Sequence, residues 1–96
     1  MRINGYEWTI RMVDRKEINN DDGECNPNKF TISIADDLKG LARITTFVHE
    51  LVHAVLNTQG RYYQKQFDLE DVCEFIAWSY LEINKCVEQF MREIGV

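Results

Sequence analysis

The sequence predicts an α+β fold, with a small antiparallel sheet of two or three strands packed by one helix and then by a longer C-terminal helix. Three observations predict it. The chain has 96 residues, which suits one domain. Apolar side chains recur every second residue in its first third, as in strands with one buried face, and every three or four residues from residue 41 onward, as in helices. This order places both helices on one face of the sheet. We therefore assign residues 1–96 to a single domain.

Two segments show the alternation of a strand. The first runs from Tyr6 to Val13, and the second from Phe30 to Ala35. The apolar face of the first consists of Tyr6, Trp8, Ile10 and Met12. The segment from Asn19 to Asn28 between them is rich in asparagine and aspartate and contains the only proline, so we expect a loop there.

Helical spacing begins at Leu41 and continues to Thr58, and Gly60 is the predicted stop. A polar, aromatic connection then leads to Asp68, which is a good N-cap residue for a long second helix. The apolar face of that helix contains Val72, Phe75, Ile76, Ile83, Cys86, Val87, Phe90 and Ile94. We expect this helix to weaken near Asn84.

Composition excludes several classes of function. The net charge is −5, which disfavours binding to a nucleic-acid backbone, because that binding depends on positive charge. No apolar run reaches the length of a membrane span, and the first residues lack the apolar core of a signal peptide. We therefore expect a cytoplasmic protein with no nucleic-acid or membrane partner.

The three cysteines form no C-x-x-C pair, so we expect reduced thiols rather than disulfides. Cys73 and Cys86 are predicted to be small core residues on a helix face. Four aromatic residues are also assigned to the core: Tyr6, Trp8, Phe67 and Trp78.

The chain's only two histidines stand four residues apart, in the order His49-Glu50-Leu51-Val52-His53. This is an H-E-x-x-H motif, and side chains four apart on a helix lie about 5–6 Å from each other on one face. Both imidazoles can therefore reach one metal ion. We expect the histidines beside the edge of the apolar face, with Glu50 further round the helix from that face.

These residue types suit catalytic zinc. Zinc accepts imidazole nitrogens in a tetrahedral shell, and a catalytic site keeps three protein ligands and one water. Glu50 is the predicted general base that takes a proton from that water. Bound zinc lowers the pKa of the water toward about 7 and polarises the carbonyl under attack.

The third ligand cannot be a histidine, because the chain has only two, and Gln59 stands where the longer H-E-x-x-H-x-x-G-x-x-H motif has its last histidine. It must be a carboxylate, a cysteine or water. The candidates downstream are Asp68, Glu70, Asp71, Cys73 and Glu74. A second helix running back past the first would present Glu70 to the metal, while Glu74, one turn later, would orient a ligand histidine.

The motif at 49–53, followed by Glu70-Asp71-Val72-Cys73-Glu74-Phe75-Ile76-Ala77, resembles the gluzincins. In that family a glutamate on the next helix completes the H-E-x-x-H site. The chain is most similar to minimal phage- and mobile-element-encoded members, which are related to the ImmA/IrrE-type metallopeptidases.

The resemblance implies a minimal zincin-like metalloprotease that hydrolyses a protein or peptide. It implies one zinc ion bound by His49, His53 and Glu70, with Glu50 as general base and Glu74 as a supporting or alternative ligand. It also implies a substrate strand lying along an edge strand near 31–34.

The sequence departs from the larger gluzincins in having no further histidine to hold the oxyanion. Local candidates for that role are Arg61, Tyr62, Tyr63 and Tyr80. Two alternatives to a protease therefore stand. One is a zinc-stabilised regulatory or binding module that has a peptidase-like site but no turnover. The other is a metal-free, helix-on-sheet interaction domain.

Overall fold

The computed structural model describes residues 1–60 and 67–96. The described elements, in chain order, are β1 (Arg2–Ile3), β2 (Tyr6–Glu7), β3 (Thr9–Val13), the 3₁₀ helix η1 (Arg15–Ile18), β4 (Gly23–Asn26), β5 (Thr31–Ala35), α1 (Gly40–Thr58) and α2 (Leu69–Glu93). This set of strands and helices confirms the α+β class.

The strands form two small sheets rather than one. Strands β1 and β2 make an antiparallel pair. Strands β3, β5 and β4 make a three-stranded sheet in that spatial order, in which β5 is central. Strand β4 runs antiparallel to β5, as predicted for the sheet, but β3 runs parallel to β5, so this sheet is mixed. Strand β5 is central because it pairs with β4 on one edge and with β3 on the other.

Two strand predictions need correction. The single strand predicted for 6–13 is divided at Trp8, whose side chain is buried while β2 turns away to pair with β1. The loop predicted for 19–28 contains β4, a short polar strand at the edge of the sheet. The sequence of β4 shows no apolar alternation. This segment is a strand because it pairs with β5 and contacts α1, and a local sequence pattern does not reveal either contact.

Both helices lie where the spacing predicts them. Helix α1 is followed by Gly60, which has a positive φ of 74° and donates its N–H to the carbonyl of Asn57. Helix α2 begins with a capping box, in which Asp68 and Asp71 each accept a hydrogen bond from the other's backbone N–H. It continues through Asn84 without a break, contrary to the expectation of weakening there. Among the described residues, neither helix has the length and apolar character needed to cross a membrane.

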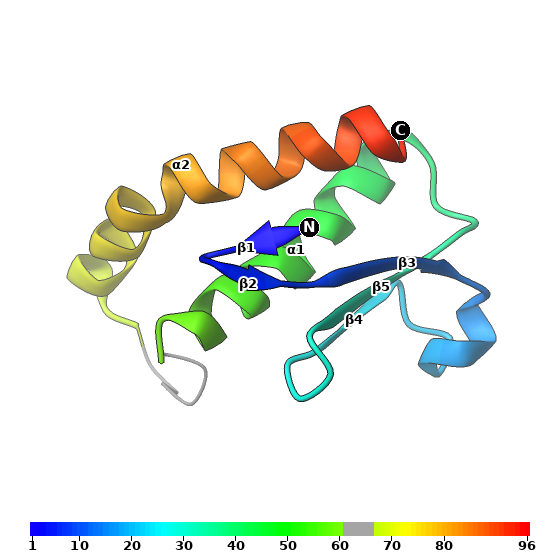
Figure 1. Cartoon of the computed structure of the whole chain (residues 1–96), viewed down its shortest axis with the longest axis horizontal. Helices are drawn as coiled ribbons and strands as arrows, with labels where there is room; N and C mark the ends of the chain where they lie inside the picture. The colour runs from blue at the N-terminus through cyan, green and yellow to red at the C-terminus, as the bar shows by residue number, and fades with distance from the viewer. Residues whose placement is uncertain (61–66) are drawn as a thin grey trace.

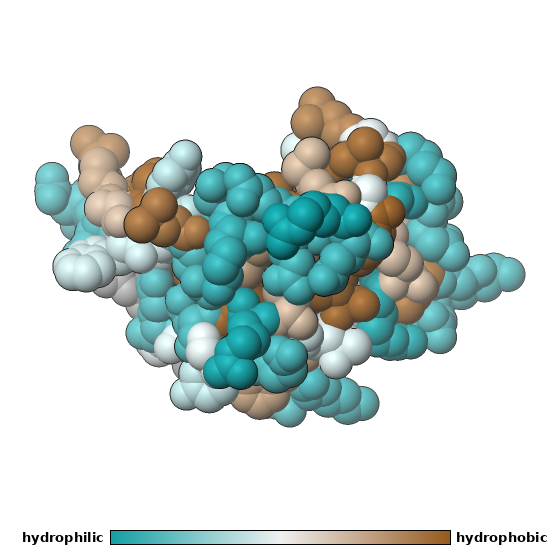
Figure 2. Space-filling model, turned by 45° about the horizontal axis from the view of Figure 1, so that its top comes forward, coloured by the Kyte–Doolittle hydropathy of each residue, from teal (hydrophilic) through white to brown (hydrophobic). Residues whose placement is uncertain are grey.

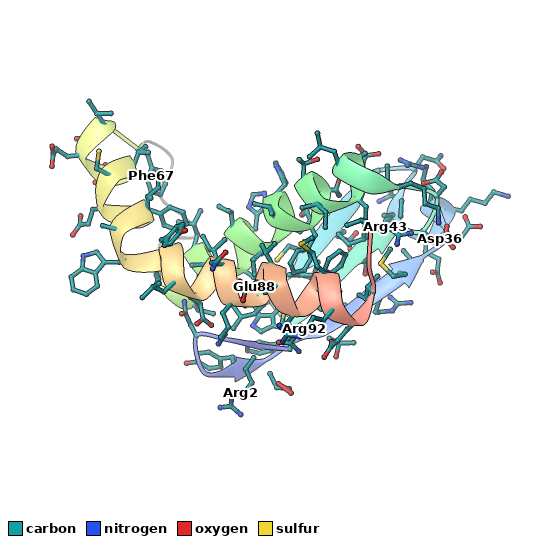
Figure 3. All side chains as sticks on the ribbon, turned by 90° about the horizontal axis from the view of Figure 1, so that it is seen from above. Arg2, Asp36, Arg43, Phe67, Glu88 and Arg92 are labelled. Atoms are coloured by element: carbon teal, nitrogen blue, oxygen red, sulfur yellow. The ribbon has the colours of Figure 1, made fainter. Side chains whose placement is uncertain are left out.

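Helix α1 is the central element of the fold. It packs against β4 and β5 of the sheet and against α2, while β1 contacts both helices (Figure 1). Figure 3 shows α2 beside α1 in its C-terminal half and extending away from it in its N-terminal half. The main core joins these elements and consists of Ile3, Trp8, Ile32, Ile34, Phe47, Leu51, Ala54, Val55, Cys86 and Phe90. Helix α1 has a wide buried face because its side chains pack both against the sheet and against α2.

The core predictions for cysteines and aromatic residues hold only in part. Trp8 and Cys86 are buried as expected. Trp78 is 79% exposed and Tyr6 is 53% exposed, and Cys73 is also exposed. Tyr6 instead stacks on Phe30 at the surface. The described cysteines are free thiols, as predicted.

Replacing Phe90 with alanine should strongly destabilise the fold, because Phe90 is fully buried and stacks on Phe47 with ring centroids 4.1 Å apart. We expect a loss of about 3–5 kcal/mol in the free energy of unfolding, measured by urea denaturation. Met91→Ala is the matched control, because Met91 is the next residue but 48% exposed, and it should change stability little. Equal losses in both variants would show that the stacked pair does not hold α2 on α1.

Candidate metal centre

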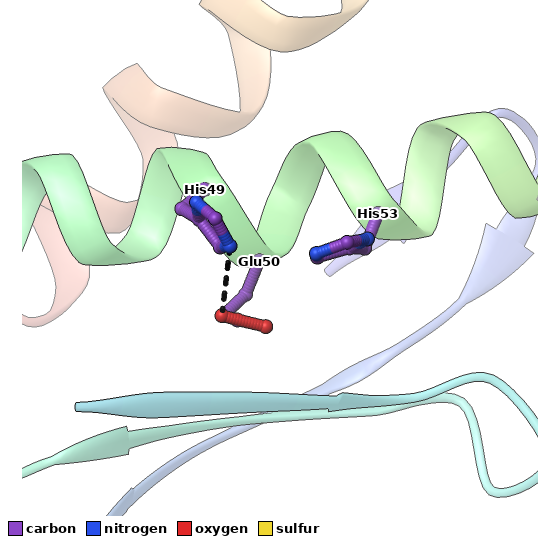
Figure 4. A group of neighbouring side chains, drawn as sticks. All are labelled: His49, Glu50 and His53. Carbon is purple, nitrogen blue, oxygen red and sulfur yellow. Dashed lines mark ion pairs between the residues drawn. The ribbon is translucent and has the colours of Figure 1, made fainter. Parts of the chain in front are cut away.

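His49, Glu50 and His53 form a group that could hold a metal ion. One ligand atom from each residue lies within 4.8 Å of the others. The two imidazole rings have centroids 5.0 Å apart, and His49 Nε2 lies 4.0 Å from Glu50 Oε2 (Figure 4). One turn of α1 separates the histidines, so the helix backbone sets their spacing. Two imidazoles on successive turns of a helix are donors that zinc accepts, so the histidines fit that metal, and the Glu50 carboxylate lies beside them.

Glu50 lies between the buried face of α1 and the histidines, whereas we predicted that the histidines would separate Glu50 from that face. Its residue is only 7% exposed, and its side chain points from α1 toward the sheet, between the core and the histidines (Figure 4). His49, in contrast, has a 70% exposed side chain. The difference arises because the apolar face of α1 is centred nearer Leu51 than Val48, where β4 and β5 pack on it.

Burial changes the acidity of Glu50. It raises the pKa of the carboxyl, as do the negative charges of Glu24 and Asp21, while the two histidines lower it. Since burial has the largest effect, the net shift is upward. A raised carboxyl pKa favours proton uptake from a neighbouring water, which is the task of a general base.

A hollow of about 470 Å³ opens beside the group. It is lined by Asp21, Asp22, Gly23, Thr45, Thr46, His49 and Glu50. Strand β4 approaches α1 closely at Gly23. A Cβ atom at this position would lie 2.9 Å from Thr46 Cγ2 and 3.0 Å from Glu50 Cγ, which is too close. The absence of a side chain at Gly23 therefore allows β4 to pack against Glu50.

Strand β4 is the edge strand beside this group. The segment near 31–34, where the resemblance placed the substrate, is the central strand β5 and is paired on both sides, so that expectation is wrong. The carbonyl of Asp22 accepts a hydrogen bond from the N–H of Ala35. Because antiparallel residues alternate between bonded and non-bonded pairs, the backbone groups of Gly23 and Cys25 point to the free edge. An extended peptide could pair with that edge.

Arg15 ties down the segment that leads into β4. Its guanidinium donates hydrogen bonds to Asp22 Oδ1 at 2.6 Å and to Asp37 at 2.8 and 3.1 Å. These bonds raise the pKa of Arg15 and lower that of Asp37. The Arg15 guanidinium therefore joins η1 to the turns before β4 and after β5, and it positions one wall of the hollow.

Glu70 and Glu74 do not join the metal group. Glu70 is exposed in the first turn of α2, and Glu74 lines a second hollow with Thr58 and Trp78. The assignment of Glu70 as third ligand stays a prediction. Tyr80 is 60% exposed on α2 and does not line the hollow beside the histidines. The other proposed oxyanion donors, Arg61, Tyr62 and Tyr63, lie outside the described residues.

Outside the H-E-x-x-H motif, no sequence pattern marked the residues of α1, of β4 and of the segment before β4 that line the hollow beside the histidines. Gly23, Asp21 and Thr46 all line the hollow, yet none belongs to a recognised motif. The one available signal was a glycine within the polar segment Asp22-Gly23-Glu24, since an isolated glycine marks a close backbone approach.

No protein-family model, curated protein or solved structure matches this chain. The resemblance to the gluzincins therefore remains a prediction based on the motif and its spacing.

Gly23→Ala should destabilise the fold by about 1–3 kcal/mol, because the new methyl group overpacks the contact between β4 and α1. Adding Thr46→Ser removes the methyl group that lies nearest and should recover part of the loss. Urea denaturation of both variants and of Thr46→Ser alone measures the coupling. If the loss of stability in the double variant equalled the sum of the losses in the two single variants, the close contact between residue 23 and Thr46 would be contradicted.

The pKa of Glu50 predicts a pH dependence of stability in the metal-free protein. Because the folded-state pKa is raised, the neutral carboxyl stabilises the fold fully below the unfolded pKa, and this contribution is lost as pH rises through the folded pKa. Glu50→Gln has no such loss, so its stability relative to the wild type should increase with pH above the ordinary glutamate range. Urea denaturation in the presence of a chelator, from pH 4 to 8, measures the difference in the free energy of unfolding between the variant and the wild type. A difference that does not change with pH would show that Glu50 has an ordinary pKa.

Proposed function

We propose that this protein is a zinc-dependent metalloprotease in which His49 and His53 bind the metal and Glu50 is the general base. One observation carries the proposal: two imidazoles on successive turns of α1 share a small space with a buried carboxylate at the edge of a sheet. A metal-free interaction domain has no evident need for a carboxylate buried there, because burial without compensation costs free energy.

The residues of the chain divide the chemistry. His49 and His53 would hold zinc through neutral nitrogens, and Glu70 is the proposed third ligand. Zinc, when bound, supplies a water of lowered pKa and polarises the substrate carbonyl. Glu50, from its buried position, accepts the proton of that water and passes it on to the leaving amine. The raised pKa of its carboxyl suits both transfers.

Strand β4 is the proposed docking edge for an extended peptide substrate. Its free backbone groups at Gly23 and Cys25 lie next to the hollow that Glu50 lines. A peptide that pairs with this edge gains main-chain hydrogen bonds irrespective of its sequence. A peptide bound in this way would have a carbonyl group near His49 and Glu50, whatever its sequence.

A zinc-stabilised module without turnover is the second candidate. It is favoured by the lining of the hollow, where the described residues include no arginine, no tyrosine and no histidine other than His49 to stabilise an oxyanion. Metal binding is common to both candidates, and only proteolysis separates them.

Metal binding is tested by calorimetric titration with zinc. We expect one zinc per wild-type chain. His53→Ala should weaken binding by more than about 100-fold, since even losing a residue that only supports a ligand costs 10–100-fold. Glu70→Gln should weaken it similarly if Glu70 is the third ligand, and Glu88→Gln, an exposed carboxylate on the far half of α2, is the matched control. Wild-type protein that binds no zinc would overturn the proposal.

Proteolysis is tested on zinc-loaded protein with denatured fluorescent casein. Glu50→Gln should keep zinc but lower the cleavage rate by about 10²–10⁴-fold, because it removes the base alone. Glu88→Gln should cleave as the wild type does. Cleavage that survives in Glu50→Gln would exclude the mechanism, and a wild type that binds zinc without cleaving would favour the module.

A further inference from the structure

The hollow beside the histidines adjoins the side of β4 that faces α1. The Cβ position of Gly23 points toward Thr46 and Glu50, so side chains on this side of the strand face the helix. Successive side chains of an extended peptide point to opposite sides. A peptide paired with the free edge of β4 would therefore direct every second side chain toward the hollow. The hollow is the part of the site that meets a side chain of the substrate.

A buried acceptor lines this hollow. The side chain of Glu50 is only 10% exposed, yet it accepts no hydrogen bond from any of the described residues. Its carboxylate lies 4.0 Å from His49 Nε2, which is beyond hydrogen-bond length. Burying a polar group without a partner costs free energy. We therefore expect this hollow to hold a bound molecule.

The charge of the hollow is negative, and Asp21 carries the part that is not yet used. No lysine or arginine is among the described residues that line it. Asp22 is paired with Arg15, and Glu50 has the proposed role of general base. Asp21, in contrast, is exposed and has no ion pair within residues 1–60 and 67–96. Its carboxylate is the one that remains for a substrate.

Neighbouring contacts fix the backbone of Asp21. Its N–H donates a hydrogen bond to the carbonyl of Ile18 at 3.0 Å. Arg15 binds on both sides of it, to the Asn20 carbonyl at 3.4 Å and to the Asp22 carboxylate at 2.6 Å. Asp21 therefore has only the freedom of one short side chain to lose when it binds a partner.

Apolar surface does not account for selection at this hollow. Figure 2 shows exposed apolar side chains gathered at the left end of the view, over the first half of α2. No described residue of α2 lines the hollow, and apart from Gly23 its described lining is polar or charged. Polar groups must therefore select the side chain that enters it.

We propose that Asp21 determines the specificity of the site by receiving a lysine or arginine side chain of an extended peptide substrate. A hollow of about 470 Å³ has room for such a long side chain. Opposite charges select this partner, and an acidic side chain would be repelled. The inference rests on the proposed function, because it names the substrate class of the same site.

Peptide binding tests the inference without requiring cleavage. The probes are two short fluorescent peptides in which threonine alternates with lysine or with glutamate, so that all charged side chains point to one side of the extended chain. The protein is zinc-loaded Glu50→Gln at about 0.15 M salt, where remote charges are screened. Fluorescence anisotropy should show about tenfold tighter binding of the lysine peptide, because like charges repel the other.

Charge reversal at Asp21 is the sharpest variant. Added to Glu50→Gln, Asp21→Lys should reverse the preference, so that the glutamate peptide binds more tightly. Asp21→Asn should reduce the preference by about threefold to fivefold, the effect of one exposed ion pair. Glu88→Lys is the matched control, because it changes the net charge equally at an exposed position of α2, and it should keep the original preference.

Two measurements guard against misfolded variants. Circular dichroism checks that each variant is folded. The same titrations with metal-free wild-type protein in a chelator need neither zinc nor the Glu50 substitution, and they should also show tighter binding of the lysine peptide.

Equal binding of the two peptides, or binding of neither, would overturn the inference. A shift in Glu88→Lys as large as that in Asp21→Lys would also overturn it, because overall charge would then select the peptide. A preference that Asp21→Lys reverses, in a protein whose wild type cleaves nothing, would support the inference and refute the protease. Casein cleavage by a wild type that binds both peptides equally would refute the inference alone.

Discussion

The packing of α1 on two sides is the constraint on which the rest of the structure depends. Phe47 stacks on Phe90 of α2, while Leu51 and Ala54 belong to the same core as the central strand β5. A helix covered in two directions keeps one side open to solvent. His49 and His53 occupy that side, and Glu50 stands at its border with the core.

The contact between β4 and α1 turns this packing into a chemical site. Gly23 lets the edge strand approach until Glu50 is almost fully buried. A buried carboxylate disfavours folding unless charged or polar neighbours compensate, and groups with such perturbed acidity concentrate at functional sites. Because Arg15 binds Asp22 and Asp37 at the ends of the neighbouring strands, the wall opposite Glu50 is also held in place.

The hollow beside the histidines has a negative border formed by Asp21 and Asp22. Part of the chain's negative charge is therefore placed where it can attract a cation such as a metal ion.

Local chemistry was sufficient to predict the helices and the spacing of the histidines. Asp68 and Gly60 act where capping rules place them, and residues 49 and 53 share a face because a helix repeats every 3.6 residues. The α+β class followed from the order of the two periodicities. Even so, the same rules misplaced Glu50 and assigned β4 to a loop.

Only the tertiary structure decided which side of α1 the sheet covers. Leu51 and Val48 are both apolar, so periodicity alone could not locate the centre of the buried face to within one residue's rotation. That rotation determines whether Glu50 faces solvent or β4. Likewise, the parallel pairing of β3 with β5 and the edge position of β4 depend on contacts between distant residues, which no local pattern encodes. The sequence by itself determined the donors of the site, and the packing of α1 between β4 and α2 determined their surroundings.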